Sequence, residues 1–238
     1  YNKGNHFLKL DKYEEALEYF EKALELDPKD SLAWHNKGVA LASLQKYEEA
    51  IKCYEKALEL DPKDAFGWFN KGYTLDDLGK HEEAIKCLEK AIELKPNLYM
   101  AWNNYARLLA DLGKHDECIK LMDQAVKSVK SDKEIAVCIN WKGVSLGNLE
   151  KYEEAFKCFQ EADRMDPKNT LFLNNMAHAL QHLNRAGEGL EIINKVLEMD
   201  KTKALYWETK GEVLQKLGRD DEAKECFARE NEIKTMHY

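Results

Sequence analysis

The sequence lacks any apolar run that approaches the roughly 20 residues a helix needs to cross a membrane. It also opens without the charged and then apolar stretch that marks a secretory signal. These absences favour a cytoplasmic protein. The chain begins without Met and within a repeat of the pattern described below, which leaves open a further segment upstream of Tyr1.

Basic residues are fewer than acidic ones. The chain holds 36 Lys and Arg residues against 44 Asp and Glu residues, a net charge of −8. Nucleic-acid binding depends on Lys and Arg neutralising phosphates, so this balance argues against nucleic acid as a main partner. The 44% of hydrophobic residues is enough for a continuous core, while the 34% of charged residues indicates much solvated helix surface.

Catalytic patterns are missing as well. No nucleophile and base occur in a recognisable constellation, and no glycine-rich stretch has the spacing of a phosphate-binding loop. We therefore predict that the chain is not an enzyme and that it holds no cofactor.

What the sequence does contain is a repeat of 34 residues. The segment Trp34-His35-Asn36-Lys37-Gly38 recurs as Trp68-Phe69-Asn70-Lys71-Gly72, and Pro28, Pro62 and Pro96 keep the same distance. A fixed period of this length indicates a solenoid built from one supersecondary unit. Alignment on the closing prolines predicts a single array of seven repeats, at about 1–30, 31–64, 65–98, 99–132, 136–169, 170–203 and 204–238. The first repeat is truncated, and three residues are inserted near 131–135.

Each repeat reads as two helices joined by a turn. In the second repeat the apolar residues of both halves recur at helical spacing, with a turn at 44–46 between them. Gly38 and Ala50 are small, which indicates that the paired helices approach closely there, with Tyr54 filling the space beside them. In other repeats the turn holds a residue suited to the left-handed conformation after a helix end: Gly79, Gly113, Asn184 or Gly218.

The six cysteines do not suggest disulfides. Cys53, Cys87, Cys158 and Cys226 occupy the same repeat position, so each lies on a different second helix. Packed helices lie about 8–10 Å apart, whereas a disulfide needs Cα atoms within about 7 Å. We therefore expect free thiols in a reducing compartment.

Small residues at the helix contact, bulky aromatics between them and a closing proline resemble the tetratricopeptide repeat family over the whole chain. One departure is the lysine before the glycine, as at Lys37 and Lys71, where the family usually has Leu; a lysine stem can cover apolar surface while its ammonium stays wet. The resemblance implies an all-α fold, an α-solenoid in which antiparallel helix pairs stack into a right-handed superhelix. It also implies a non-catalytic scaffold or adaptor whose first helices line a concave groove.

The family's groove positions predict a peptide-binding surface along these first helices. Asn2, Asn36, Asn70, Asn104 and Asn175 share one repeat position and form a spaced column of amides. Amides can hold the backbone of a partner's extended segment or helix without reading its sequence, and the column is similar to those in other tetratricopeptide superhelices. The alternative is that Asn is simply common at this position of such repeats.

Aromatic and acidic side chains accompany the amides. Phe66, Phe69, Tyr73 and, in the column's own position, Trp141 predict contacts with apolar partner side chains, unless some pack against neighbouring first helices. The acids would favour a basic or mixed segment; they are Asp76, Asp77, Asp111, Glu208 and Glu212. The other predicted groove residues are Arg107, Asn140 and His178.

Two more specific sites are weighed against this groove. The carboxylate clamp of chaperone-binding family members is not predicted: Asn5 and Asn36 match its amides, but Tyr1, Phe66 and Asn70 replace its cations. His178 and His182 lie four residues apart on one predicted helix, which is the spacing for sharing a metal ion, with Glu208 or Glu212 as a third ligand. Because solvated histidines are commoner than such sites, we predict no metal.

Two other functions stay open at this point. The truncated N-terminal end could support structural self-association, or the chain could be the targeting half of a larger enzyme whose catalytic domain lies outside it. The insertion near 131–135 could also divide the array into a regular block of four repeats and a looser block of three.

Overall fold

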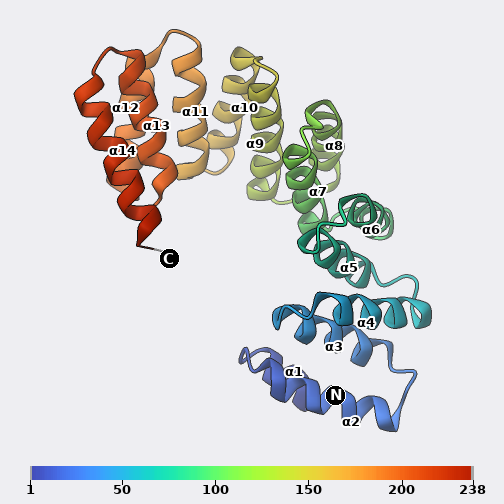
Figure 1. The fold of residues 1–238 in the computed structure, drawn as a ribbon. Coiled ribbons are helices and arrows are strands. Elements are labelled where there is room, and N and C mark those ends of the chain that lie inside the picture. The colour runs from blue at the N-terminus through green and yellow to red at the C-terminus, as the bar shows by residue number, and fades with distance from the viewer. Residues whose placement is uncertain (1, 237–238) are drawn as a thin grey trace. The chain divides into compact units, whose positions relative to one another are not determined.

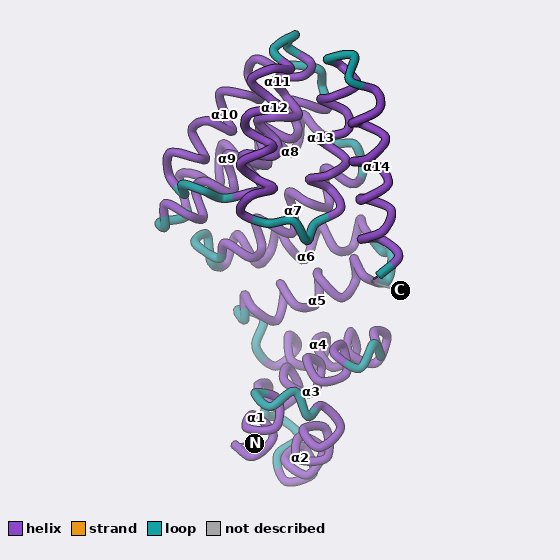
Figure 2. The backbone as a smooth tube through the Cα atoms, turned by 90° about the vertical axis from the view of Figure 1, so that its left-hand side faces the viewer, coloured by secondary structure: helices purple, strands orange, loops and turns teal. Residues whose placement is uncertain are grey.

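The computed structural model describes residues 2–236, which form helices joined by short turns, with no strand among them (Figures 1 and 2). The helices are α1 (Asn2–Leu8), α2 (Tyr13–Leu26), α3 (Ser31–Ser43), α4 (Tyr47–Leu60), α5 (Ala65–Asp77), α6 (His81–Leu94), α7 (Tyr99–Asp111), α8 (His115–Ser128), α9 (Asp132–Asn148), α10 (Tyr152–Met165), α11 (Thr170–His182), α12 (Ala186–Met199), α13 (Ala204–Lys216) and α14 (Asp220–Thr235). Not one of these described helices is both long enough and apolar enough to cross a membrane. Tyr1, which stands at a cation position of the carboxylate clamp, lies outside the described residues.

The helices pack in consecutive pairs, such as α3 with α4, α5 with α6, α9 with α10 and α11 with α12 (Figure 1). The prediction of an all-α solenoid of helix pairs is therefore confirmed. Contacts divide the chain into two compact units, Tyr1–Leu108 and Leu109–Tyr238, which we call unit 1 and unit 2. The insertion near 131–135 lies inside unit 2, where it forms no loop. Instead, α9 starts at Asp132 and has 17 residues, against 13 in α11.

Left-handed residues end the first helix of most pairs. Gly79, Gly113, Asn184 and Gly218 all have positive φ, as their sequence positions predicted. Gln45 and Glu150 adopt the same conformation at φ values of 59° and 61°, although neither is a glycine or an asparagine. The turn geometry is thus kept where the favoured residue is absent, because the packing of the helices on both sides holds it.

A glycine on the first helix of a pair lies against an aromatic ring on the second. A Cβ built at Gly38 would lie 2.6 Å from Tyr54 Cε1, and one at Gly143 would lie 2.6 Å from Phe159 Cε1. Both distances are shorter than any real contact, so only glycine allows the helices to approach this closely. The prediction that Gly38 marks a close helix contact is confirmed.

A tryptophan ties each of several repeats to the one before it. In each case its indole Nε1 donates a hydrogen bond to a backbone oxygen six residues earlier: Trp34 to Pro28 at 3.0 Å, Trp68 to Pro62 at 3.0 Å, Trp102 to Pro96 at 2.7 Å and Trp207 to Lys201 at 3.1 Å. The lysine before the glycine makes a second link, since Lys37 pairs with Glu21 and Lys71 with Glu55, both at 2.9 Å. These contacts recur from repeat to repeat.

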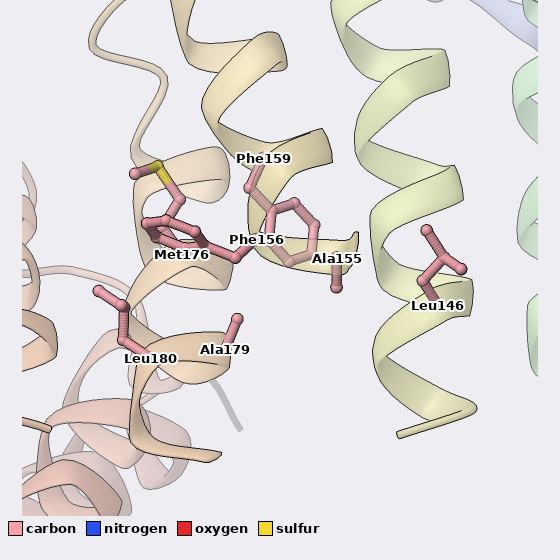
Figure 3. Packing of buried hydrophobic residues seen from close by; sticks show 7 residues of the cluster. All are labelled: Leu146, Ala155, Phe156, Phe159, Met176, Ala179 and Leu180. Atoms are coloured by element: carbon pink, nitrogen blue, oxygen red, sulfur yellow. The ribbon is translucent and has the colours of Figure 1, made fainter. Parts of the chain in front are cut away.

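The core of unit 2 runs from one repeat into the next. Leu146 of α9, Phe156 and Phe159 of α10, and Met176, Ala179 and Leu180 of α11 belong to one buried cluster with Ala155 (Figure 3). Because a single helix pair cannot bury both of its apolar faces, each pair depends on its neighbour for part of its core.

All six cysteines are free, as predicted, and five of them are buried. Burial raises the pKa of Cys53 to about 11 and the pKa of Cys138 to about 12. At neutral pH these thiols are protonated and behave as small hydrophobic side chains.

Two glycine substitutions in unit 2 test the close helix contact. We expect Gly143→Ala to lower the free energy of unfolding by about 1–3 kcal/mol, because the new methyl would overlap the buried ring of Phe159. Gly187, in the first turn of α12, has no neighbouring atom within 4 Å of the place that a Cβ would take, so Gly187→Ala should stabilise by about 0.5–1 kcal/mol. Urea denaturation followed by circular dichroism measures both; similar changes in the two variants would contradict the packing role of Gly143.

Candidate functional site

Two pockets at equivalent repeat positions open beside the first helices, one in each unit. The α3–α5 pocket in unit 1 has a volume of about 370 Å³ and is lined by Val39, Ala42, Ser43, Gln45, Tyr47, Tyr54, Asn70, Tyr73, Thr74 and Asp77. The α9–α11 pocket in unit 2 has a volume of about 480 Å³ and is lined by Val144, Gly147, Asn148, Glu150, Tyr152, Ala155, Phe159, Asn174, Asn175, His178, Ala179, His182, Leu205 and Thr209.

The two pockets use the same repeat positions. Every residue of the α3–α5 pocket has a counterpart 105 residues later in the α9–α11 pocket, as in Val39 and Val144, or Asn70 and Asn175. That distance is three periods of 34 residues plus the three-residue insertion. The pocket is therefore a product of the repeat itself. Chemistry differs at several counterpart positions. Tyr73 and Asp77 of unit 1 correspond to His178 and His182 of unit 2, and the amide of Gln45 corresponds to the carboxylate of Glu150.

Some of the predicted groove residues meet in these pockets. Asn70, Tyr73 and Asp77 line the first pocket, and Asn175 and His178 line the second. Sequence reasoning missed the walls that come from the turn and the second helix, namely Gln45 and Tyr47 in unit 1 and Glu150 and Tyr152 in unit 2. Their recurrence at a fixed repeat position was visible in the sequence, but the groove was assigned to first helices alone.

Amides of the predicted column form hydrogen bonds between neighbouring first helices. Asn36 Nδ2 donates to Asn5 Oδ1 at 2.9 Å, Asn70 Nδ2 to His35 Nε2 at 3.0 Å, and Asn175 Nδ2 to Asn140 Oδ1 at 2.9 Å. His35 is oriented by Asp64, whose Oδ2 lies 2.7 Å from His35 Nδ1. Asn104 differs, because its Nδ2 donates to the backbone oxygen of Met100 in its own helix. One N–H of each of these amides is thus already in use.

Two predicted groove residues are buried. Phe69 is 9% exposed and Asn140 is 3% exposed, because their shared repeat position is covered by the neighbouring first helix. Phe66, by contrast, is 41% exposed, with Lys95 Nζ 4.3 Å from the centre of its ring. Trp141 is half-buried.

The two neighbouring aspartates at the end of α5 have different surroundings. Asp76 is nearly buried and pairs with Arg107 and with His81, whose Nδ1 lies 2.9 Å from Asp76 Oδ1. Asp77 is exposed on the pocket wall and has no ion pair among the described residues. Partial burial, and then the charge of Asp76, raise the pKa of Asp77. The groove acid available to a partner in unit 1 is therefore Asp77, whereas Asp76 positions Arg107.

In unit 2 the two histidines lie side by side. Their ring centres are 4.9 Å apart, and the Tyr152 ring stacks on His182 at 4.2 Å. Burial, followed by the neighbouring His178 and Lys216, lowers the pKa of His182. His178 Nε2 is 3.9 Å from Glu212 Oε2, yet among the described residues no group of three His, Cys, Asp or Glu side chains is placed to hold a metal ion.

The same histidines also line a second opening, the α11–α13 pocket. It has a volume of about 560 Å³ and is formed by His178, Gln181, His182, Glu212, Gln215 and Lys216. Gln181 is 4% exposed and its Nε2 donates to Glu212 Oε2 at 2.9 Å, which fixes the direction of the amide. The opposite atom, Gln181 Oε1, is buried with no hydrogen-bond partner within residues 2–236.

A second buried side-chain oxygen also lacks a hydrogen-bond partner. Asn174 is 2% exposed on the wall of the α9–α11 pocket, and its Oδ1 has no partner within the part of the chain that the structure describes. A buried acceptor without a donor typically costs about 1–3 kcal/mol, so two of them beside one histidine pair call for a functional explanation.

Comparison with known proteins agrees with the repeat. Models of the tetratricopeptide repeat match residues 1–65, 65–98, 87–120, 137–169 and 204–229. No curated protein matches the chain by sequence.

Several solved structures are similar in fold. A tetratricopeptide repeat protein from Parabacteroides merdae aligns over 98% of this chain and 91% of its own, with a TM-score of 0.76 and 16% identity. PilF of Pseudomonas aeruginosa aligns over 89% and 95%, with a TM-score of 0.71 and 18% identity. MamA of Desulfovibrio magneticus aligns over 72% and 96%, with a TM-score of 0.62 and 18% identity. At these identities the likeness concerns the fold alone.

Two buried asparagines at the same repeat position provide a matched test of the unpartnered oxygen. We expect Asn174→Leu to raise the free energy of unfolding by about 1–3 kcal/mol, because it removes a buried acceptor that has no donor. Asn140→Leu should lower it by about 1 kcal/mol, since it takes the acceptor from Asn175. Chemical denaturation of both variants measures the difference; equal destabilisation would show that the Asn174 amide is satisfied in the folded protein.

Proposed function

Because the chain belongs to the tetratricopeptide repeat family, whose fold commonly mediates protein–protein interaction, we propose that it binds an extended segment of a partner protein against its first helices. The observation that carries this proposal is the recurrence of one pocket at identical repeat positions in both units. A surface that the repeat itself generates suits a ligand that is also periodic, which an extended peptide is.

The amides that line the pockets would hold the backbone of such a segment. Asn70 and Asn175 each use one N–H to reach the preceding first helix. Each keeps a second N–H, and an asparagine side chain also carries an acceptor oxygen. The bond to the neighbouring helix fixes the direction of the amide, so its remaining groups are oriented before a peptide arrives, which lowers the entropy lost on binding.

Exposed apolar side chains beside the pockets set a spacing for the partner. They occupy the second position of successive repeats: Leu32, Phe66 and Met100 in unit 1, and Leu171 and Leu205 in unit 2. Packed helices are about 8–10 Å apart, and an extended chain advances about 3.3 Å per residue. Within one unit, a partner with an apolar side chain at about every third residue would therefore contact successive repeats.

The α3–α5 pocket suits a cationic side chain. Tyr47, Tyr54 and Tyr73 contribute to its wall, and the Asp77 carboxylate lies there with no ion pair among the described residues. Aromatic faces and a carboxylate both attract an ammonium or a guanidinium group. Burial of a cation next to Asp77 would also offset the repulsion from Asp76 that raises the pKa of Asp77.

A peptide-display selection tests this function. Peptides would be selected on the wild-type protein and then measured by fluorescence anisotropy against Tyr73→Ala/Asp77→Ala. We expect selected sequences with a Lys or Arg and regularly spaced apolar residues, and a loss of about tenfold or more in affinity, roughly 1.4 kcal/mol, in the pocket variant.

The matched control is Lys56→Ala/Glu59→Ala, which removes an exposed pair of α4 at 2.7 Å outside the pocket. It should bind the same peptides as the wild type does. Equal binding by all three proteins would move the site away from the α3–α5 pocket, and a selection without enrichment would overturn peptide binding by the groove.

A further inference from the structure

His178 and His182 of unit 2 occupy the repeat positions that Tyr73 and Asp77 occupy in unit 1. We propose that the two pockets sharing His178 and His182 bind an arginine side chain of the partner segment while both imidazoles are neutral, and release it when they are protonated. This inference rests on the proposed function, whose peptide it describes more closely: it adds the chemistry of one partner residue and a dependence on pH.

The first support is a shortage of donors around the histidines. Asn174 lines the α9–α11 pocket and Gln181 lines the α11–α13 pocket, and the side-chain oxygen of each is buried without a partner within residues 2–236. The bond from Gln181 Nε2 to Glu212 fixes which end of that amide is the acceptor. A ligand that supplies N–H donors would satisfy both oxygens, and a guanidinium carries five N–H donors with no acceptor.

The second support is the charge around the pair. Glu150 lines the α9–α11 pocket, and Glu212 lines the α11–α13 pocket 3.9 Å from His178. Lys216 is the cation on that wall; it is exposed, so its flexible stem can keep the ammonium in water. With neutral imidazoles, the carboxylates therefore outnumber the cations, which favours a cationic ligand over an anionic one.

Shape agrees with an arginine in particular. Tyr152 and His182 both line the α9–α11 pocket, and a planar guanidinium packs against aromatic rings better than an ammonium does. The apolar part of the α9–α11 pocket, which includes Val144 and Leu205, would cover the stem. Pockets of about 480 and 560 Å³ leave room for a side chain of this length.

Protonation reverses the electrostatics of the site. The groups that face His182 are Glu150 before α10, Tyr152 on α10, His178 on its own helix, and Glu212 and Lys216 on α13. Burial together with His178 and Lys216 lowers the pKa of His182, so its neutral form prevails at neutral pH. At low pH, protonation of the imidazoles places positive charge beside a bound guanidinium and repels it.

The experiment uses three blocked tripeptides, acetyl-Ala-X-Ala-amide, with Arg, Leu or Glu as X. Binding to the full chain would be followed by NMR through the side-chain amide signals of Asn174 and Gln181, from about pH 7.5 to about pH 5.5, where imidazole titrates. We expect the Arg peptide alone to shift both signals at the higher pH. Its dissociation constant should rise about tenfold for each pH unit below the pKa of one essential neutral imidazole.

Variants separate the role of the histidines from general effects of pH. His178→Gln/His182→Gln keeps polar side chains of similar length but cannot be protonated, so it should bind the Arg peptide with little change across the pH range. His6→Gln, in unit 1, should keep the pH dependence of the wild type. Asn174→Leu, whose folding is checked by the stability measurement above, should weaken binding about tenfold, the equivalent of one hydrogen bond of roughly 1.4 kcal/mol.

Several outcomes would overturn the proposal. Binding of the Glu peptide that tightens as the pH falls would make the pair an anion site, and equal binding of all three peptides would show that the site selects no cation. Persistence of the pH dependence in the double glutamine variant would place the titrating group elsewhere. In each case display-selected peptides still bound by the wild type would leave the proposed function standing.

Discussion

The contact of a glycine with an aromatic ring fixes both the fold and the site. Gly38 allows Tyr54 to lie directly against α3, and Gly143 allows Phe159 to lie against α9. The same two rings form part of the walls of the α3–α5 and α9–α11 pockets. A larger residue at either glycine would push the paired helices apart and displace the ring, so the pocket cannot be changed at this point without disturbing the core. The same positions therefore shape both the core and the pocket.

At other positions of the repeat, the residues that hold the fold together differ from those that line the pockets. Residues that hold neighbouring repeats together, such as Trp34 and Trp68 with their hydrogen bonds to proline carbonyls, recur almost unchanged. The residues that give each pocket its chemistry do not, since Tyr73 and Asp77 correspond to His178 and His182. One scaffold therefore carries an acidic, aromatic pocket in unit 1 and an imidazole pocket in unit 2. Because the wall positions are exposed, exchanging them costs little packing energy.

Asparagines of the column both link neighbouring helices and line pockets. Asn36, Asn70 and Asn175 donate to the preceding first helix, while Asn70 and Asn175 also line pockets. An amide can do this because it has two donors and an acceptor, and a bond on one side leaves the rest oriented toward a ligand. The frequency of Asn at this position, considered alone, fits a structural and a binding role equally well. The contacts show that the structural role exists and is compatible with the other.

The sequence by itself determined the helix pairs, the left-handed turns at Gly79 and Gly218 and the free thiols, because a 34-residue period repeats local signals that need no tertiary information. It also named several pocket residues, among them Asn70 and Asp77. Only the tertiary structure decided which groove positions are covered by a neighbouring helix, as Phe69 and Asn140 are, and which acid is already paired, as Asp76 is. It also showed that the insertion near 131–135 lengthens α9. The reason is physical: a period fixes the face on which a side chain emerges, whereas burial and pairing depend on what the adjacent repeat places opposite it.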